Sequence, residues 1–162
     1  MNTKLLTSFA ATALAVAVVG ATAGHAAPQT GSTVTYTLKF QGPTGLVNVH
    51  PHAKGDVLRN PLPGDALLAR SRVLDASGHA VGRTSEMCTV TIRRPATYAC
   101  SIAVLLTDGS QLLVEGAVNP SRTPWTAPVV GGTGRYAGAR GTVEVTDAPG
   151  KTATERWSVT LE

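Results

Sequence analysis

Alternation of apolar and polar residues with a period of two is the feature that most constrains the fold of this chain. In TVTYTLKF, residues 33–40, the apolar side chains fall on one face and the threonines and lysine fall on the other. Such alternation in a segment rich in β-branched residues is typical of a half-buried strand. Further strands are predicted at 66–75, 81–92, 96–107, 110–118, 125–130, 135–146 and 151–162.

No segment keeps a helical period, and turns rich in glycine and proline separate the predicted strands. About eight short strands at regular spacing indicate an all-β sandwich or barrel.

The stretch GTGRYA, residues 132–137, matches the dinucleotide-binding pattern G-x-G-x-x-A. That pattern holds a pyrophosphate only where a helix begins at the glycines. Strand-forming residues follow here instead, in GTVEV at 141–145. We therefore expect the glycines of this region to permit positive φ angles in a tight turn and a close approach of strands. They are Gly131, Gly132, Gly134, Gly138 and Gly141.

The longer stretch PVVGGTGRYAGARG, residues 128–141, resembles the hallmark of dirigent proteins and of allene oxide cyclase-like barrel proteins. Three further stretches precede it in the order that this resemblance leads us to expect. They are GDVLRNPL, VLDASGHAVGRTSEMCTV and TDGSQLLVEGAV. The resemblance covers roughly residues 33–161. It implies an eight-stranded antiparallel β-barrel with a central apolar cavity, usually dimeric or trimeric. It also implies that a small apolar molecule is bound and is cyclised, or steered in a coupling reaction, without a cofactor.

The first 26 residues have the pattern of a secretory signal peptide: one lysine, an apolar run, and small residues before the cleavage site at Ala26. The apolar run from Leu5 to Val19 is shorter than the ~20 residues that a spanning helix needs, so we expect no stable membrane insertion. We expect residues 27–162 to form one secreted barrel domain.

Charge and histidine content favour neither nucleic acid nor metal. The formal net charge of +4 is spread along the chain, and its one basic pair, at 93–94, has no interleaved aromatic residues. His50 and His52 lie on one side of an extended segment, but no third ligand is identifiable, because His79 falls in a predicted turn.

The two cysteines lie on neighbouring predicted strands. A hairpin centred on Arg94 pairs Ile92 with Ala96, and then Val90 with Tyr98. The same register places Cys88 directly opposite Cys100. Two opposed cysteines in an exported chain predict a disulfide.

The next hairpin turns at Asp108-Gly109, a strong turn signal. A two-residue loop would pair Ile102 with Glu115, whereas one extra bulge residue would pair Ile102 with Gly116. We prefer the second register, because it aligns Val104 with Val114 and Leu106 with Leu112. It also directs Glu115 outward.

The strand face that carries the cysteines is nearly all apolar and should line the interior. Glu86 shares this face, and Glu155 shares a face with the apolar residues of the last strand. A carboxylate among apolar side chains costs several kcal/mol unless it is paired or protonated, so both are candidate acids or bases. The alternative for Glu86 is a solvated position at the rim. Arg140 is a candidate cationic partner, and its alternative is an ion pair at the surface or an interface. The candidate ligand contacts are Tyr36, Tyr98, Ile102, Val104 and Trp157.

Two functions remain open. One is a cofactor-free cyclase or isomerase that acts on an apolar substrate inside the barrel. The other is a non-catalytic secreted barrel, lipocalin-like, with a binding or structural role. A polar cluster among the inward side chains would favour chemistry, and a wholly apolar lining would favour binding.

Overall fold

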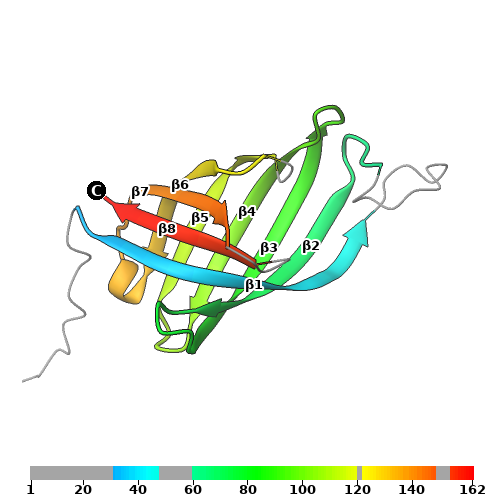
Figure 1. The fold of residues 1–162 in the computed structure, drawn as a ribbon. Coiled ribbons are helices and arrows are strands. Elements are labelled where there is room, and N and C mark those ends of the chain that lie inside the picture. Colours follow the sequence, from blue (N-terminus) through cyan, green and yellow to red (C-terminus); the bar gives the residue numbers. More distant parts are fainter. Residues whose placement is uncertain (1–30, 48–59, 120–121, 149–153) are drawn as a thin grey trace, which may run out of the picture.

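Alternate residues of each strand are buried, so the period of two separates the inside of a closed sheet from its outside. The computed structural model describes residues 31–47, 60–119, 122–148 and 154–162. Eight antiparallel strands in sequence order form a closed barrel, with the first strand paired to the last (Figure 1). The all-β, eight-stranded antiparallel prediction is confirmed. The strands are β1 (Thr33–Val47), β2 (Ala66–Leu74), β3 (Ala80–Ile92), β4 (Thr97–Leu106), β5 (Gln111–Val118), β6 (Trp125–Thr133), β7 (Gly141–Asp147) and β8 (Thr154–Leu161).

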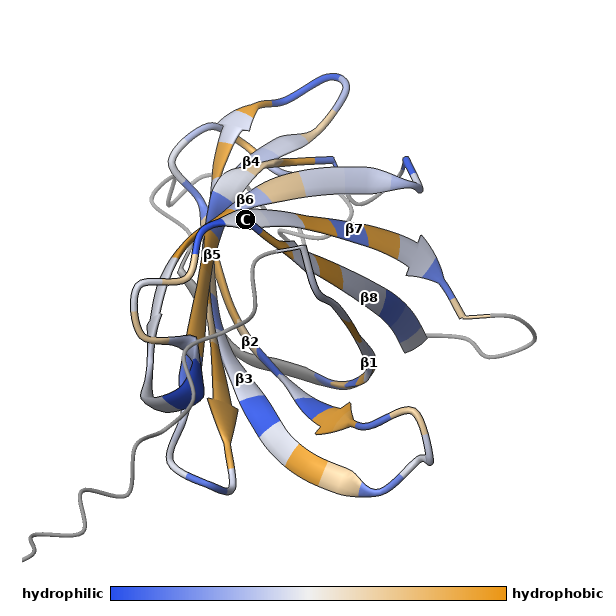
Figure 2. Ribbon diagram, turned by 90° about the vertical axis from the view of Figure 1, so that its left-hand side faces the viewer, coloured by the Kyte–Doolittle hydropathy of each residue, from blue (hydrophilic) through white to orange (hydrophobic). Residues whose placement is uncertain are grey.

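The core lies inside the barrel and draws on all eight strands. Apolar and polar residues alternate along the strands in Figure 2, as two-sided packing requires. The largest fully buried side chains are Trp157, Leu38, Leu112, Leu161, Val73, Val90, Val104, Val114, Val129, Val143 and Val145.

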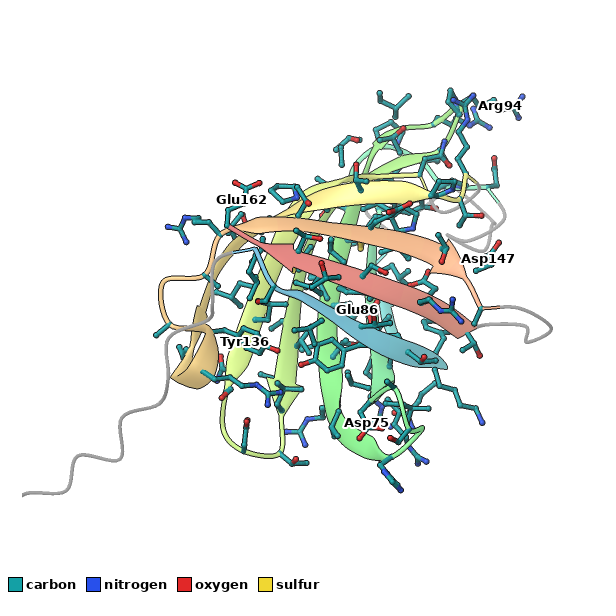
Figure 3. The ribbon with its side chains drawn as sticks, turned by 60° about the vertical axis from the view of Figure 1, so that its left-hand side comes forward. Asp75, Glu86, Arg94, Tyr136, Asp147 and Glu162 are labelled. Carbon is teal, nitrogen blue, oxygen red and sulfur yellow. A yellow bond between two sulfur atoms is a disulfide. The ribbon has the colours of Figure 1, made fainter. Side chains whose placement is uncertain are left out.

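The two ends of the barrel differ. The end that we call the glycine end carries the connections 75–79, 107–110 and 134–140. The opposite end, the hairpin end, carries the turn 93–96 between β3 and β4 and the first residues of β6 and β8. Tyr136 and Arg94 mark these two ends in Figure 3.

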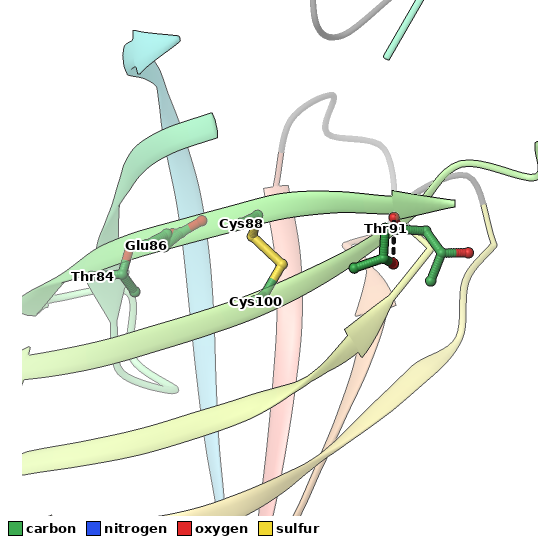
Figure 4. The surroundings of a disulfide bond; sticks show 6 residues. Thr84, Glu86, Cys88, Thr91 and Cys100 are labelled. Atoms are coloured by element: carbon green, nitrogen blue, oxygen red, sulfur yellow. Dashed lines mark hydrogen bonds between the residues drawn. A yellow bond between two sulfur atoms is a disulfide. The ribbon is translucent and has the colours of Figure 1, made fainter. Parts of the chain in front are cut away.

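The β3–β4 hairpin has the predicted register over most of its length. Cys88 pairs with Cys100, and their sulfurs are bonded at 2.06 Å, which confirms the disulfide (Figure 4). Near the turn, a register shift after Val90 pairs Ile92 with Thr97 rather than with Ala96.

The β4–β5 hairpin differs from the predicted register by two residues. Ile102 pairs with Val114, not with Gly116. The turn is tighter than expected, because Leu106 N–H donates to the carbonyl of Ser110 and Ser110 N–H donates to the Asp108 carboxylate. A shift of two residues leaves every side chain on its original face, so Glu115 is exposed as predicted.

The glycine-rich stretch makes a turn and a close strand crossing. Gly134 and Gly138 have φ angles of +60° and +75°, and Gly134 begins a single 3₁₀ turn, η1 (Gly134–Tyr136). Only from Gly141 is the predicted strand 135–146 extended. A Cβ atom on Gly132 would lie 2.5 Å from the carbonyl oxygen of Gln111, so β5 and β6 are in close contact there. Gly131 has neither a positive φ nor such a contact.

Several sequence-based expectations concern residues outside the described ranges, namely the signal peptide, His50 and His52. His79 is exposed in the β2–β3 turn, where its Nδ1 lies 3.7 Å from the Asp75 carboxylate. The described residues contain no group of three or more His, Cys, Asp or Glu side chains arranged to hold a metal ion. Across the same ranges, no helix is both long enough and apolar enough to cross a membrane.

Candidate functional site

Two carboxylates belong to the inward-facing rows of the barrel. Glu86 lies in the middle of β3, between the buried Thr84 and Cys88 of the same face (Figures 3 and 4). Glu155 lies near the start of β8, two residues before Trp157 on the inward face and opposite Leu38 of β1. Strand alternation therefore placed both acids correctly, and both are partly buried.

Glu86 accepts hydrogen bonds from two buried hydroxyl groups. Ser71 Oγ donates to its Oε1 at 3.0 Å, and Thr84 Oγ1 donates to the same oxygen. Thr84 Oγ1 in turn accepts the backbone N–H of Ser71 at 2.7 Å, which fixes its orientation. We call these three residues the hydroxyl–carboxylate cluster. Ser71 and Thr84 were not predicted as site residues from the sequence, although both lie at inward-facing positions of their strands.

Glu155 has a different environment. Burial, the larger effect, and the charges of Glu86 and Asp147 raise its pKa, while the hydrogen bond from Trp157 lowers it; the net pKa is raised. Trp157 Nε1 donates to Glu155 Oε2 at 2.9 Å. Because the charge of Glu86 helps to raise the pKa of Glu155, the two carboxyl groups interact within the barrel.

Aromatic rings extend this site toward the hairpin end. Trp125 packs edge-on against Trp157, with ring centroids 5.9 Å apart. Within the described ranges, Trp125 Nε1 is a buried donor without a hydrogen-bond partner. The predicted ligand contacts Tyr36, Tyr98, Ile102, Val104 and Trp157 all belong to the buried core.

The Cys88–Cys100 disulfide joins β3 to β4 on the inner face of the wall, one inward position from Glu86 (Figure 4). Glu86 sits opposite Ile102, and Cys88 sits opposite Cys100. The covalent link therefore holds β3, the strand that carries Glu86, to its neighbour β4.

Arg140 is not beside either carboxylate. Its side chain is exposed, and its Nη1 donates to the carbonyl oxygens of Val130 at 2.5 Å and Ala139 at 2.9 Å. The guanidinium thus ties the chain before β7 to β6.

A second polar group lies at the glycine end, and of its members only Tyr36 was predicted from the sequence. The hydroxyl oxygens of Tyr36 and Tyr136 are 2.6 Å apart, and Arg135 Nη2 donates to Tyr36 at 3.1 Å. Arg135 also lies 3.4 Å from the Asp108 carboxylate, with its guanidinium 5.2 Å from the centre of the Tyr136 ring. Burial, followed by the hydrogen bond with Tyr136, raises the pKa of Tyr36 far above its ordinary value. Tyr136 was not predicted, because it lies in a turn, where strand alternation does not indicate the direction of a side chain.

Comparison with known proteins agrees with this architecture. The family model for the allene oxide cyclase barrel-like domain matches residues 46–161. Pyocyanin demethylase has a similar structure, with a TM-score of 0.62 and 20% sequence identity; the match covers 81% of this chain and 100% of that one. A pterocarpan synthase dirigent protein gives a TM-score of 0.62 at 18% identity, with 81% and 94% of the two chains covered.

The Diels Alderase AbmU from Streptomyces koyangensis is similar with a TM-score of 0.56 and 18% identity, over 81% of this chain and 63% of that one. No curated protein sequence matches the chain. At these identities the solved structures establish a common fold.

Proposed function

Because the chain belongs to the allene oxide cyclase barrel-like family, we propose that it binds a small apolar molecule inside the barrel and catalyses a cofactor-free cyclisation or isomerisation. The observation that carries the proposal is the pair of inward carboxylates, Glu86 and Glu155, in a mostly apolar interior. A lining built for binding alone has no need of two interacting acids.

The different environments of the two acids suggest different roles. Glu155 holds its proton to higher pH because its pKa is raised by burial, so it is the proton donor. Glu86, which two hydroxyl groups orient, is the proton acceptor. One proton given to the ligand and one taken from it leave its formula unchanged, as an isomerisation or ring closure requires. Such acid–base catalysis contributes about 10²–10⁴-fold, and holding a reactive conformer supplies much of the rest.

The ligand's class can be identified without a prior guess. We expect native mass spectrometry of protein purified from its own producer to show a retained apolar molecule. That molecule and its isomers then provide the substrates for a turnover assay. A ligand that is always returned unchanged would favour the non-catalytic, lipocalin-like alternative.

The acid–base roles are tested with isosteric variants. Glu155→Gln and Glu86→Gln should each retain ligand binding but lose about 100-fold or more in turnover. Glu144→Gln, on the outer face of β7, is the matched control and should keep full activity. Full turnover in both inward variants would overturn the catalytic assignment and leave ligand binding intact.

We also propose that the mature domain is exported. A disulfide persists in oxidising compartments and is rare in the cytosol, so the Cys88–Cys100 bond supports a secreted location. The N-terminal pattern at 1–26 supports the same proposal. Mass spectrometry of the protein in culture medium should find a chain that begins at Ala27, and a protein retained in the cytosol would contradict it.

A further inference from the structure

The tyrosine pair at the glycine end has one more hydroxyl hydrogen than the hydrogen bond between its two oxygens uses. Tyr36 and Tyr136 supply two hydroxyl hydrogens, and the single bond between their oxygens uses one of them. Arg135 has only N–H groups, so it donates to Tyr36 and cannot accept the other hydrogen. Among the described residues, neither tyrosine has a further partner, although each is only 3% exposed.

A buried hydroxyl hydrogen without an acceptor costs free energy comparable to a lost hydrogen bond. Such groups in native proteins call for an explanation, and a role in binding or catalysis is one. The location fits this explanation. Tyr36 is on the inward face of β1, opposite Trp157, whose indole holds Glu155. The hydroxyl pair and the acid site are therefore neighbours within one interior, with the tyrosines toward the glycine end.

The surrounding charges strengthen the pair as a donor. The guanidinium of Arg135 bonds to Tyr36 and lies over the Tyr136 ring, and its position is fixed by the Asp108 carboxylate. A cation that donates to one hydroxyl makes that hydroxyl a better donor to the next group. Tyr36 keeps its proton at neutral pH, and burial raises its pKa further above the ordinary value of 10.0.

We infer that the Tyr36–Tyr136 pair, backed by Arg135, is a hydrogen-bond donor site for a carbonyl oxygen of the ligand. The inference rests on the proposed function and narrows its substrate class to apolar molecules that carry a ketone, enone or quinone-type oxygen. It also fixes their orientation: the carbonyl lies toward the glycine end and the remainder toward Glu86 and Glu155. Bound in this way, the oxygen would be stabilised as negative charge develops on it during proton transfer.

Two probes of similar shape test the donor site. They are 2-acetylnaphthalene, labelled with ¹³C at its carbonyl, and 2-ethylnaphthalene, which lacks the oxygen. In the wild-type protein the ¹³C signal should move downfield on binding, as hydrogen bonding withdraws electrons from the carbonyl carbon. The double variant Tyr36→Phe/Tyr136→Phe is needed, because either tyrosine alone keeps one unpaired hydroxyl hydrogen. It should weaken acetylnaphthalene binding about tenfold, the value of one hydrogen bond, and abolish the downfield shift. Its affinity for ethylnaphthalene should stay within about twofold, because the apolar contacts remain.

Arg135→Gln is a second variant, at a partly exposed side chain, that leaves both tyrosines in place. It should weaken acetylnaphthalene binding by a smaller factor than the double variant does. If the double variant does not fold, the wild-type shift and the Arg135→Gln affinity decide the question.

The outcomes separate the donor site from the proposed function. In one outcome both naphthalenes bind, the carbonyl signal does not move, and each variant changes the affinity for the two probes by the same factor. The donor site is then wrong, and the proposed binding of apolar molecules stands. If neither naphthalene binds to the wild-type protein, the proposed binding function fails for molecules of this class, and the donor site fails with it.

Discussion

Glu86 and Glu155 face the same interior but interact with different partners, and the partners determine what each can do. Glu86 is an acceptor for two hydroxyl groups, whereas Glu155 has one indole donor and a pKa that burial raises. Two acids whose environments differ in this way are suited to opposite proton-transfer roles. This contrast can be tested by stability as well as by turnover.

The raised pKa of Glu155 predicts a specific pH dependence of stability. The folded protein holds this proton more tightly than the unfolded chain does, so the stabilisation is complete below the ordinary value of 4.5 and is lost as pH rises through the raised folded value. Glu155→Gln cannot ionise, and its amide oxygen can still accept from Trp157. Denaturant unfolding should therefore show the variant gaining stability relative to wild type between pH 4 and pH 8. Stability curves for Glu155→Gln that run parallel to those of the wild-type protein would contradict the effect of burial.

Thr84 should contribute more to stability than Ser71, although both hydroxyls bind Glu86. Thr84 Oγ1 also accepts the Ser71 backbone N–H, and Thr84→Val would leave that donor and the carboxylate short of a partner. We expect a loss of about 1–3 kcal/mol for Thr84→Val, and a smaller loss for Ser71→Ala. Urea unfolding measures both. Thr126→Val, on the exposed face of β6, is the matched control and should change stability by less than ~0.5 kcal/mol. Equal losses for Thr84→Val and Thr126→Val would refute this role.

Among the structural elements, the stretch 128–141 combines a strand end, a 3₁₀ turn and a strand start, and two of its glycines meet different constraints. At Gly138 the constraint is conformational, because φ is +75° and the space around it is open. At Gly141 a φ of +143° is combined with close packing against the carbonyl of Thr160. The turn directs Tyr136 into the barrel, so its geometry positions part of the interior.

Alanine substitutions should separate these two constraints. Gly138→Ala should cost about 1–2 kcal/mol, the penalty for a side chain in a left-handed conformation. Gly141→Ala should cost distinctly more, because its Cβ would also overlap the Thr160 carbonyl and push β7 from β8. Thermal and denaturant unfolding of the two variants would decide, and similar losses would show that the close packing relaxes easily.

Strand alternation predicted the faces of the strands better than it predicted their register. The pairing of Cys88 with Cys100 followed from a short turn, and it gave the disulfide and the inward direction of Glu86. The predicted β4–β5 register differs from the observed one by two residues, because a hydrogen bond to the Asp108 side chain tightens that turn. Alternation cannot detect a shift of two residues, since every side chain stays on the same face. Tyr136 and Arg135 could not be placed, since a glycine turn has no period from which a direction follows.

At the scale of the whole molecule, the barrel buries its inner residues but leaves several large apolar side chains on its surface. Leu68 and Met87 are direct cross-strand neighbours on the outer face of β2 and β3, with exposed fractions of 37% and 54%. Leu113 on β5 is 38% exposed. Exposed apolar side chains of this size are suited to contacts between copies of the chain.

We expect the protein to self-associate as a dimer or trimer. Sedimentation velocity at micromolar concentration should show a species heavier than one chain. Met87→Lys should shift the distribution toward monomer, because a charge would have to be buried beside Leu68. Leu113→Lys, on β5 and two strands along the barrel wall from β3, is the comparison and should have the smaller effect. Monomer alone in the wild-type protein would contradict the expectation.

Closure of the barrel by β1 and β8 also brings the two ends of the folded domain together. Gly31 N–H donates to the carbonyl of Leu161 at 2.7 Å, and Leu161 N–H donates to the carbonyl of Ser32 at 3.0 Å. Both ends therefore leave the barrel at the glycine end, next to each other (Figure 1). A short linker could join them into a circular backbone without crossing the hairpin end. For the same reason, attachment to a support through either end would present the same opposite rim to the surrounding solution.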